Sequence, residues 1–113
     1  MDKKITVAFY KSATGAQPVR DWLLEQSDQD RRTIGRDIQR LEFERPVGMP
    51  HCRSLDQGLW EVRSRISGGR IARVVFCVSG GQMILLHAFV KKTQRTPRQD
   101  IKLALRRMQE GLS

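Results

Sequence analysis

Hydrophobic and polar residues alternate through most of the second half of the chain, and this pattern predicts β-strands. Residues 59–66, 70–78 and 83–92 are rich in β-branched and aromatic residues, and two glycine pairs separate them. Glycine pairs favour tight turns, so the three segments are expected to form consecutive antiparallel strands. The centre of the third strand, MILLHAFV, is apolar on both faces, as expected of a strand that is buried on both sides. Residues 4–10 alternate more loosely and are predicted as a further strand.

Three other segments have hydrophobic residues at the spacing of an α-helix. Residues 18–26 open with Pro18, which suits the first turn of a helix because the missing N–H has no partner there. A second helix is predicted from Ser27 or Asp28 to about Glu44, and a third from about Pro97 to near Gly111. The two longer helices are expected to bury residues at i, i+4 and i+7, namely Ile34, Ile38 and Leu41 in one and Ile101, Leu105 and Met108 in the other.

The predicted order of elements is β-α-α-β-β-β-α within a single domain, residues 1–113. This is an α+β fold with one antiparallel sheet, mixed only at the first strand, an N-terminal α-hairpin and a C-terminal helix. All helices are expected on one face of the sheet. Residues 45–53 contain two prolines and are expected to form a connecting loop.

Charge is distributed unevenly along the chain, whose formal net charge is +9. Residues 1–51 hold nine Lys/Arg and eight Asp/Glu, whereas residues 52–113 hold twelve and four. A one-sided excess of this kind indicates an anionic partner: nucleic acid, an acidic protein or a membrane surface. No run approaches the ~20 apolar residues of a membrane helix, and the start lacks a secretory signal. A cytoplasmic protein that does not insert into membranes is expected.

Few residues suit a metal or a cofactor. Cys52 and Cys77 lie 25 positions apart without CxxC spacing, and the chain has only two histidines. No metal and no cofactor are expected, and a cysteine in a strand is usually a small hydrophobe. The chain also lacks a paired carboxylate motif, a P-loop and the G-x-S-x-G of serine hydrolases.

Strand parity predicts a cationic surface on the sheet. Arg63 and Arg65 fall on one side of their strand, and a hairpin centred on residue 68 places Arg63 opposite Arg73. Two like charges directly opposed destabilise a sheet, so the arrangement suggests a bound anion. In the alternative interpretation, Glu61 and solvation relieve the repulsion.

The register of the last hairpin has two interpretations. A loop centred on residue 80 places His87 opposite Arg73, with Phe89 and Lys91 on the cationic face. A two-residue turn at residues 80–81 places Lys92 there instead. Arginines suit phosphate, and if the protein is an enzyme that acts on RNA, the 2′-hydroxyl next to the scissile phosphate would be its nucleophile. Phe89 would then either stack on a base or belong to the core.

Three strings carry a family resemblance: GLWEVR at 58–63, RIAR at 70–73, and LHAFVKKTQRTP at 86–97. With these strings the chain resembles the RelE/ParE toxin superfamily, closest to its phage-derived HigB-like branch. The resemblance implies the toxin of a type II toxin–antitoxin system, an endoribonuclease that enters the ribosomal A site and cuts messenger RNA without a metal. A cognate antitoxin with a helix-turn-helix is the expected protein partner.

The resemblance also assigns roles to residues. Tyr10 is the only tyrosine and does not match the terminal tyrosine of RelE, so proton transfer would fall to Lys91, Lys92 or His87. The alternatives are a ParE-like toxin that binds gyrase and a non-catalytic RNA- or ribosome-binding module. The expected catalytic residues are Arg73, Lys92, Lys91 and His87, and the expected RNA- or phosphate-binding residues are Arg63, Arg65, Arg53, Gln94 and Arg95.

Overall fold

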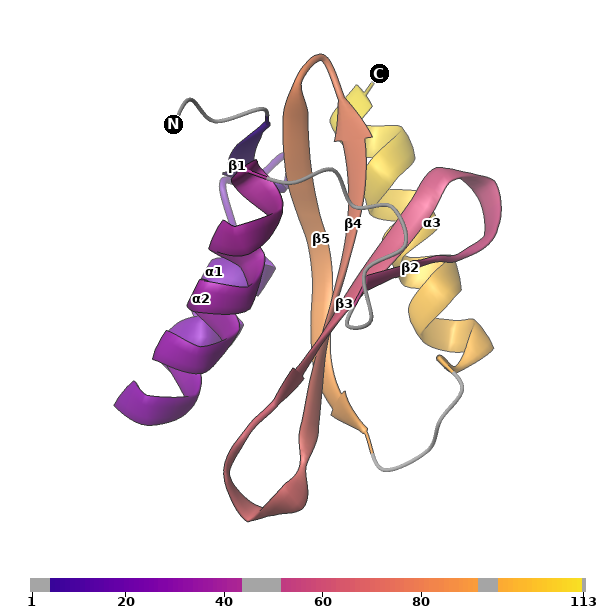
Figure 1. Ribbon diagram of the computed structural model, residues 1–113. Coiled ribbons are helices and arrows are strands. Elements are labelled where there is room, and N and C mark those ends of the chain that lie inside the picture. The colour runs from indigo at the N-terminus through magenta and orange to yellow at the C-terminus, as the bar shows by residue number, and fades with distance from the viewer. Residues whose placement is uncertain (1–4, 44–51, 92–95, 113) are drawn as a thin grey trace.

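A computed structural model describes residues 5–43, 52–91 and 96–112 of the chain. The described part forms a five-stranded sheet between helices, with strand order β1-β5-β4-β3-β2 (Figure 1). The strands are β1 (Thr6–Phe9), β2 (Cys52–Ser54), β3 (Leu59–Arg65), β4 (Ile71–Ser79) and β5 (Gln82–Lys91). The helices are α1 (Pro18–Leu24), α2 (Asp28–Phe43) and α3 (Arg98–Leu112), with short 3-10 turns at Asp56–Gly58 and Ser67–Gly69.

The predicted α+β class and the mixed sheet are confirmed. Strand β1 pairs in parallel with β5, and every other pairing is antiparallel. The prediction of a loop at Cys52 and Arg53 is wrong, because both belong to β2, which pairs with β3. Three residues are too few to show an alternating pattern, so this edge strand leaves no signal in the sequence.

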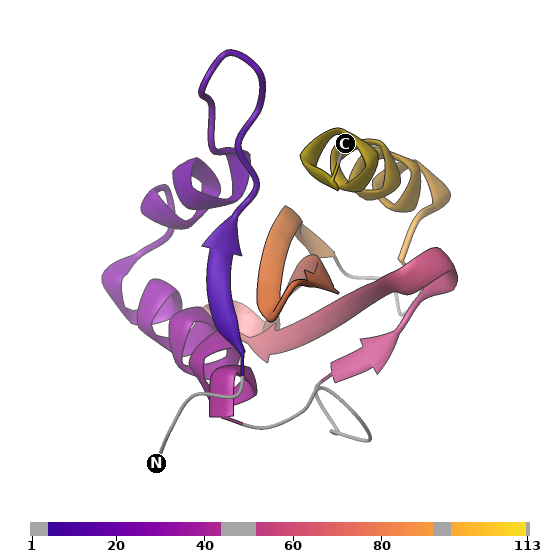
Figure 2. The ribbon, with the colours of Figure 1, turned by 90° about the horizontal axis from the view of Figure 1, so that it is seen from above.

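The helices cover both faces of the sheet, and the prediction of a single covered face is wrong. Ile34, Ile38 and Leu41 of α2 pack with residues of even parity in β3 and β4. Ala104 of α3 packs with odd-numbered residues of β3 and β4, among them Leu59. Figure 2 shows α1 and α2 on one side of the sheet and α3 on the other. We call these two sides the α2 face and the α3 face.

The second helix begins where its sequence predicts. The Ser27 hydroxyl accepts a hydrogen bond from the Asp30 N–H at 3.2 Å, as expected of an N-cap. Ile34 and Leu41 are fully buried and Ile38 almost so, which confirms the predicted stripe. None of the described helices is long and apolar enough to cross a membrane.

The β4–β5 hairpin contains a bulge that neither predicted register includes. Its turn is the two-residue type, with Ser79 opposite Gln82, and the same register continues to Phe76 opposite Leu85. The next pair is Val75 with His87, so Leu86 is an extra residue in β5. The bulge reverses the parity of the rest of β5 relative to β4.

As a result, the last part of β5 turns toward the α3 face. Arg73 lies opposite Phe89 rather than His87, and Lys91 lies opposite Ile71. His87 and Phe89 therefore share a face with Arg73, as the register centred on residue 80 predicts, although the partner it assigns to Arg73 is wrong.

Polar contacts hold α3 onto this bulge. Arg107 donates a hydrogen bond to the Leu86 carbonyl at 2.8 Å, and its guanidinium lies 5.7 Å from the centre of the Tyr10 ring. The Tyr10 hydroxyl donates to Glu110 at 2.5 Å. A bulge disturbs the ladder locally, and here a side chain of α3 binds the carbonyl of the extra residue.

Candidate functional site

The α3 face carries a group of cations near the start of α3. Arg63 lies opposite Arg73, and Arg65 follows on the same side of β3, which confirms the predicted register of the first hairpin. Arg53 of β2 lies opposite Glu61 of β3, so it joins this face from the sheet edge. We call this group, together with the neighbouring Glu61 and Phe89, the basic sheet face. Its cationic or basic members are Arg53, Arg63, Arg65, Arg73 and His87.

Arg73 lies at the bottom of the basic sheet face and is paired. Its side chain is 1 % exposed, and its Nη1 donates to Oε1 of the fully buried Glu61 at 3.0 Å. Arg53 Nε lies 3.5 Å from the same oxygen, and the Thr96 hydroxyl donates to the other. Glu61 thus offsets the repulsion between Arg73 and Arg63, which agrees with the alternative interpretation that Glu61 and solvation, rather than a bound anion, relieve it. Arg73 is a fixed buried charge rather than a surface ligand.

The arginines that solvent reaches surround this buried pair. Arg65 is exposed, Arg63 is half-buried, and the Arg53 side chain is 44 % exposed. Guanidinium groups bind phosphate oxygens through two parallel hydrogen bonds and keep their charge at all relevant pH values. These three arginines can therefore hold an anionic ligand over Arg73.

His87 forms a pair with Asp100 at the edge of the same face. Its Nε2 lies 2.7 Å from Asp100 Oδ1, and the two side chains are 14 % and 15 % exposed. Phe89 stacks on the imidazole, with ring centres 5.3 Å apart. A carboxylate that orients an imidazole is an arrangement suited to proton transfer. The sequence reasoning missed Asp100, because nothing in the pattern of α3 separates it from an ordinary acid in a first helical turn.

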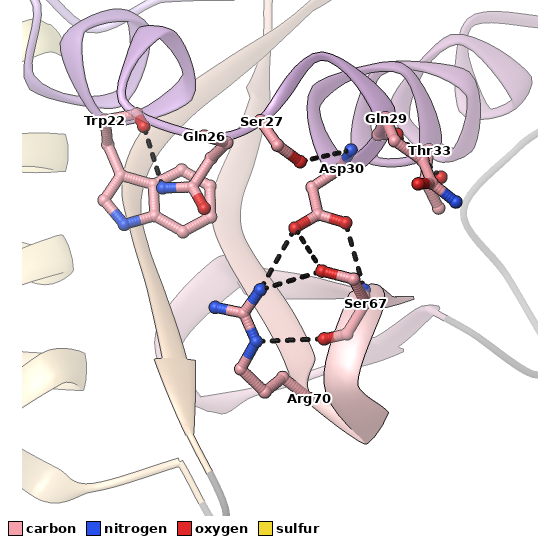
Figure 3. Close-up of polar contacts among 8 residues, drawn as sticks. All are labelled: Trp22, Gln26, Ser27, Gln29, Asp30, Thr33, Ser67 and Arg70. Carbon is pink, nitrogen blue, oxygen red and sulfur yellow. Dashed lines mark hydrogen bonds and ion pairs between the residues drawn. The ribbon is translucent and has the colours of Figure 1, made fainter.

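A polar cluster ties the β3–β4 turn to α2 (Figure 3). The Asp30 carboxylate accepts hydrogen bonds from the Ser67 N–H (3.0 Å), the Ser67 hydroxyl (2.9 Å) and Arg70 Nη2 (3.1 Å). Chiefly because of the Ser67 N–H, the pKa of Asp30 lies below its usual 3.8. Gly68 and Gly69 supply the positive φ angles of this turn. The cluster holds the tip of the hairpin that carries Arg65.

The remaining predicted residues lie at the end of β5 or beyond it. The backbone of Lys91 is in the ladder opposite Ile71, and its side chain lies outside the described part of the structure. Lys92, Gln94 and Arg95 lie outside the described residues.

Tyr10 lies away from the basic sheet face. Its partner Glu110 is ten residues along α3 from Asp100, which corresponds to roughly 15 Å of helix. The hydrogen bond to Glu110 raises the pKa of the Tyr10 hydroxyl. A tyrosine at this place is therefore no substitute for a proton-transfer residue near Arg73.

Both cysteines are buried and free, as expected of small hydrophobes. Burial raises the pKa of the Cys52 thiol to about 11, and it also raises the pKa of Cys77. Since the thiolate is the reactive form, neither is placed to act as a nucleophile. Within residues 5–43, 52–91 and 96–112, no three His, Cys, Asp or Glu side chains gather as a metal site would require.

Comparison with known proteins gives one family. The model of the family described as Phage derived protein Gp49-like (DUF891) matches residues 21–109, which include α2, the whole β2–β5 segment and most of α3. No curated protein matches the chain.

Proposed function

The chain belongs to the phage-derived Gp49-like family of RelE/HigB-type toxin-like proteins, and from this premise we propose that it is a ribosome-dependent endoribonuclease. It would be the toxin of a type II toxin–antitoxin system and would cleave messenger RNA in the ribosomal A site. The observation that carries the proposal is the position of the His87–Asp100 pair on the same sheet face as Arg53, Arg63 and Arg73.

The proposed reaction uses the RNA itself as nucleophile. His87, oriented by Asp100, accepts the proton of the 2′-hydroxyl while that oxygen attacks the adjacent phosphorus. The bond from phosphorus to the 5′-oxygen breaks, and the leaving oxygen takes up a proton. The products are a 2′,3′-cyclic phosphate and a 5′-hydroxyl. Lys91, the last residue of β5, or Lys92, the next residue in the sequence, is the candidate donor of that second proton.

Charge stabilisation would come from the arginines. Arg63, Arg65 and Arg53 would bind the phosphates on either side of the scissile bond, because solvent reaches all three. Arg73 would act from beneath, as a charge fixed by Glu61 that needs no reorganisation during the reaction. Phe89, stacked on His87, would support the imidazole rather than a base. Gln94 and Arg95 stay candidates for RNA contact.

The test is primer extension on a reporter message after induction of the toxin in cells. The wild type should produce defined cleavage ends, and His87→Gln should lower the cleavage rate by about 100- to 10,000-fold, the usual contribution of a general acid or base. Arg63→Gln should weaken cleavage by removing a phosphate ligand. Arg20→Gln removes the same charge from an exposed position on α1 and should leave cleavage unchanged.

Two results would reject the proposed site. One is cleavage at the wild-type rate by both His87→Gln and Arg63→Gln. The other is a loss of cleavage in Arg20→Gln as large as that in Arg63→Gln, because cleavage would then depend on net charge and not on this site. A loss of activity in His87→Gln supports the site only in a variant that circular dichroism shows to be folded. Lys91→Ala and Lys92→Ala then decide which lysine protonates the leaving group.

The burial of Arg73 favours a second candidate function, a non-catalytic module that binds RNA or the ribosome. Such a module would show salt-dependent RNA binding without any cleavage product in the presence of translating ribosomes. A ParE-like toxin would instead stop replication before translation. In the toxin reading the partner is a cognate antitoxin, which we propose is a helix-turn-helix protein encoded by the adjacent reading frame.

A further inference from the structure

The side of α2 that points away from the sheet carries arginines one helical turn apart. Arg32, Arg36 and Arg40 are exposed and follow at intervals of four residues, which places them about 6 Å apart along the helix axis. None of the three has an ion pair within the described chain. We call them the α2 stripe. Gly35 lies beside it, and a Cβ at that position would meet no atom within 4 Å.

The acids of α2 do not neutralise this stripe. Asp30 and Glu42 are buried, and Asp28 pairs with Arg31 at the start of the helix. Asp37 is half-buried, and the 100° step per residue places it on the flank between the stripe and the core. The outward side of α2 is therefore positive along most of its length.

The outward side of α3 repeats the arrangement. Arg98, Lys102 and Arg106 are exposed at the same four-residue spacing and have no ion pair among the described residues. We call them the α3 stripe. Asp100 binds inward to a histidine of β5, and the exposed Glu110 accepts a hydrogen bond from the tyrosine that follows β1. Apart from the exposed Asp28 and Glu110, the acids of the two helices are buried or half-buried, whereas the cations of both stripes are exposed.

The two stripes point in opposite directions. Helix α2 packs its apolar stripe on one face of the sheet and α3 on the other, so their outward sides lie on opposite surfaces of the molecule (Figure 2). A flat ligand reaches only one of these surfaces at a time. Both stripes can be occupied together only by a ligand that has phosphates on two sides of the protein.

We propose that the α2 stripe and the α3 stripe bind RNA phosphates simultaneously, so that the protein sits between two walls of one folded RNA. The inference rests on the proposed function for its partner class, RNA, and does not require cleavage. It assigns RNA contacts to surfaces separate from the basic sheet face.

A protein partner suits these surfaces poorly. Stable protein interfaces are built around buried aromatic or aliphatic anchors. The exposed large hydrophobic side chains of the described chain are Phe9, Leu24 and Val78, and none of them belongs to α2 or α3. Phosphate binding needs only cations at regular spacing, because it gains its free energy from released counterions. Charge without apolar anchors therefore favours RNA over an acidic protein.

The test measures binding to purified ribosomes as a function of salt concentration. Two double variants are compared with the wild type: Arg36→Gln/Arg40→Gln in the α2 stripe and Lys102→Gln/Arg106→Gln in the α3 stripe. Each lost phosphate contact lowers the slope of log K against log salt by about 0.7 to 0.9, so each double variant should lower it by about 1.4 to 1.8. The combination of all four changes should lower it by roughly twice as much.

The matched control is Lys11→Gln/Arg20→Gln, which removes two exposed charges that lie off both stripes. It should leave the slope within about 0.5 of the wild-type value, since no phosphate contact is lost. All variants should keep the unfolding temperature of the wild type, because exposed side chains without partners contribute little to stability.

Several outcomes would overturn the inference. If one double variant matches the control, RNA touches one side only. If the combined variant loses no more slope than a double variant, the two sides are alternatives rather than simultaneous contacts. If the double variants bind ribosomes normally but fail to co-purify with the product of the adjacent reading frame, the stripes serve a protein. A wild type that binds ribosomes with a steep salt slope and cleaves nothing would instead refute the proposed function alone.

Discussion

The buried Arg73–Glu61 pair gives the most quantitative prediction for this fold. Glu61→Gln removes the carboxylate charge while keeping the shape of the side chain, and it leaves the Arg73 guanidinium buried at 1 % exposure beside an amide. Removing one partner of a buried ion pair costs about 3 to 5 kcal/mol of unfolding free energy. The contacts of Glu61 with Arg53 and Thr96 weaken as well, which places the expected loss in the upper part of that range.

The loss converts into a large thermal shift. Unfolding entropy near the midpoint is about 2.1 cal/mol/K per residue, or roughly 0.24 kcal/mol/K for 113 residues. Glu61→Gln, with an expected loss of about 4 to 5 kcal/mol, should therefore lower the unfolding temperature by roughly 17 to 21 °C, measured by circular dichroism or calorimetry. Glu25→Gln is the same chemical change at an exposed position and should alter the free energy of unfolding by less than about 0.5 kcal/mol.

A double-mutant cycle separates the pair from its surroundings. Arg73→Met removes the guanidinium and fills a similar volume, so Glu61→Gln/Arg73→Met contains no buried charge. The double variant should be more stable than Glu61→Gln alone by at least about 1 kcal/mol. If Glu61→Gln unfolds within about 0.5 kcal/mol of the wild type, Arg73 is not held as a buried charge and the geometry of the basic sheet face is wrong.

Four further predictions follow from single side chains. The Ser64 hydroxyl is buried without a hydrogen-bond partner in the described chain, so Ser64→Ala should raise the unfolding free energy in urea by about 1 kcal/mol, and a decrease would contradict this. Gly35→Ala should also stabilise by about 1 kcal/mol, because the new methyl group meets open space; a loss would mean that this part of α2 is not helical. The fold lowers the pKa of Asp30, so the stability that its charged carboxylate contributes is complete above the usual carboxyl pKa of 3.8. This contribution disappears as the pH falls through the pKa of Asp30 in the folded protein. Asp30→Asn should therefore flatten the decline of the unfolding temperature below about pH 4. Both cysteines are buried, and the pKa of Cys52 is about 11, so neither thiol should react with a disulfide reagent at about pH 8 until denaturant is added. Fast labelling of the native protein would show that the thiols are exposed.

The first hairpin could be predicted from the sequence because its turn defines its register. A turn centred on residue 68 places Arg63 opposite Arg73. The charged side chains of β3 then identify the cationic side of the strand. The presence of Glu61 on the same face also follows from parity. The burial of Glu61 and its pairing with Arg73 do not follow from parity, because they depend on tertiary contacts such as the hydrogen bond from Thr96, which is distant in the sequence.

The placement of the helices had a signal in the sequence. The centre of β5 is apolar at both parities, and a strand buried on both sides requires a covering layer on each face. Helix α3 supplies the second layer through Ala104 and its neighbours. The His87–Asp100 contact had no such signal, since it joins two elements whose relative position is set by that packing.

One extra residue in β5 decides whether a candidate catalytic site exists on this sheet. Near the turn, Leu85 faces the α2 side with Phe76, and strict alternation from there would direct His87 into the same apolar core. Leu86 interrupts the alternation, and Arg107 of α3 binds its carbonyl. The contact that fixes α3 on the sheet is thus made at the residue that turns His87 toward α3, where Asp100 meets it. The helix that covers this face and the bulge that brings His87 to it depend on each other, so the basic sheet face is a product of tertiary packing and not of β5 alone.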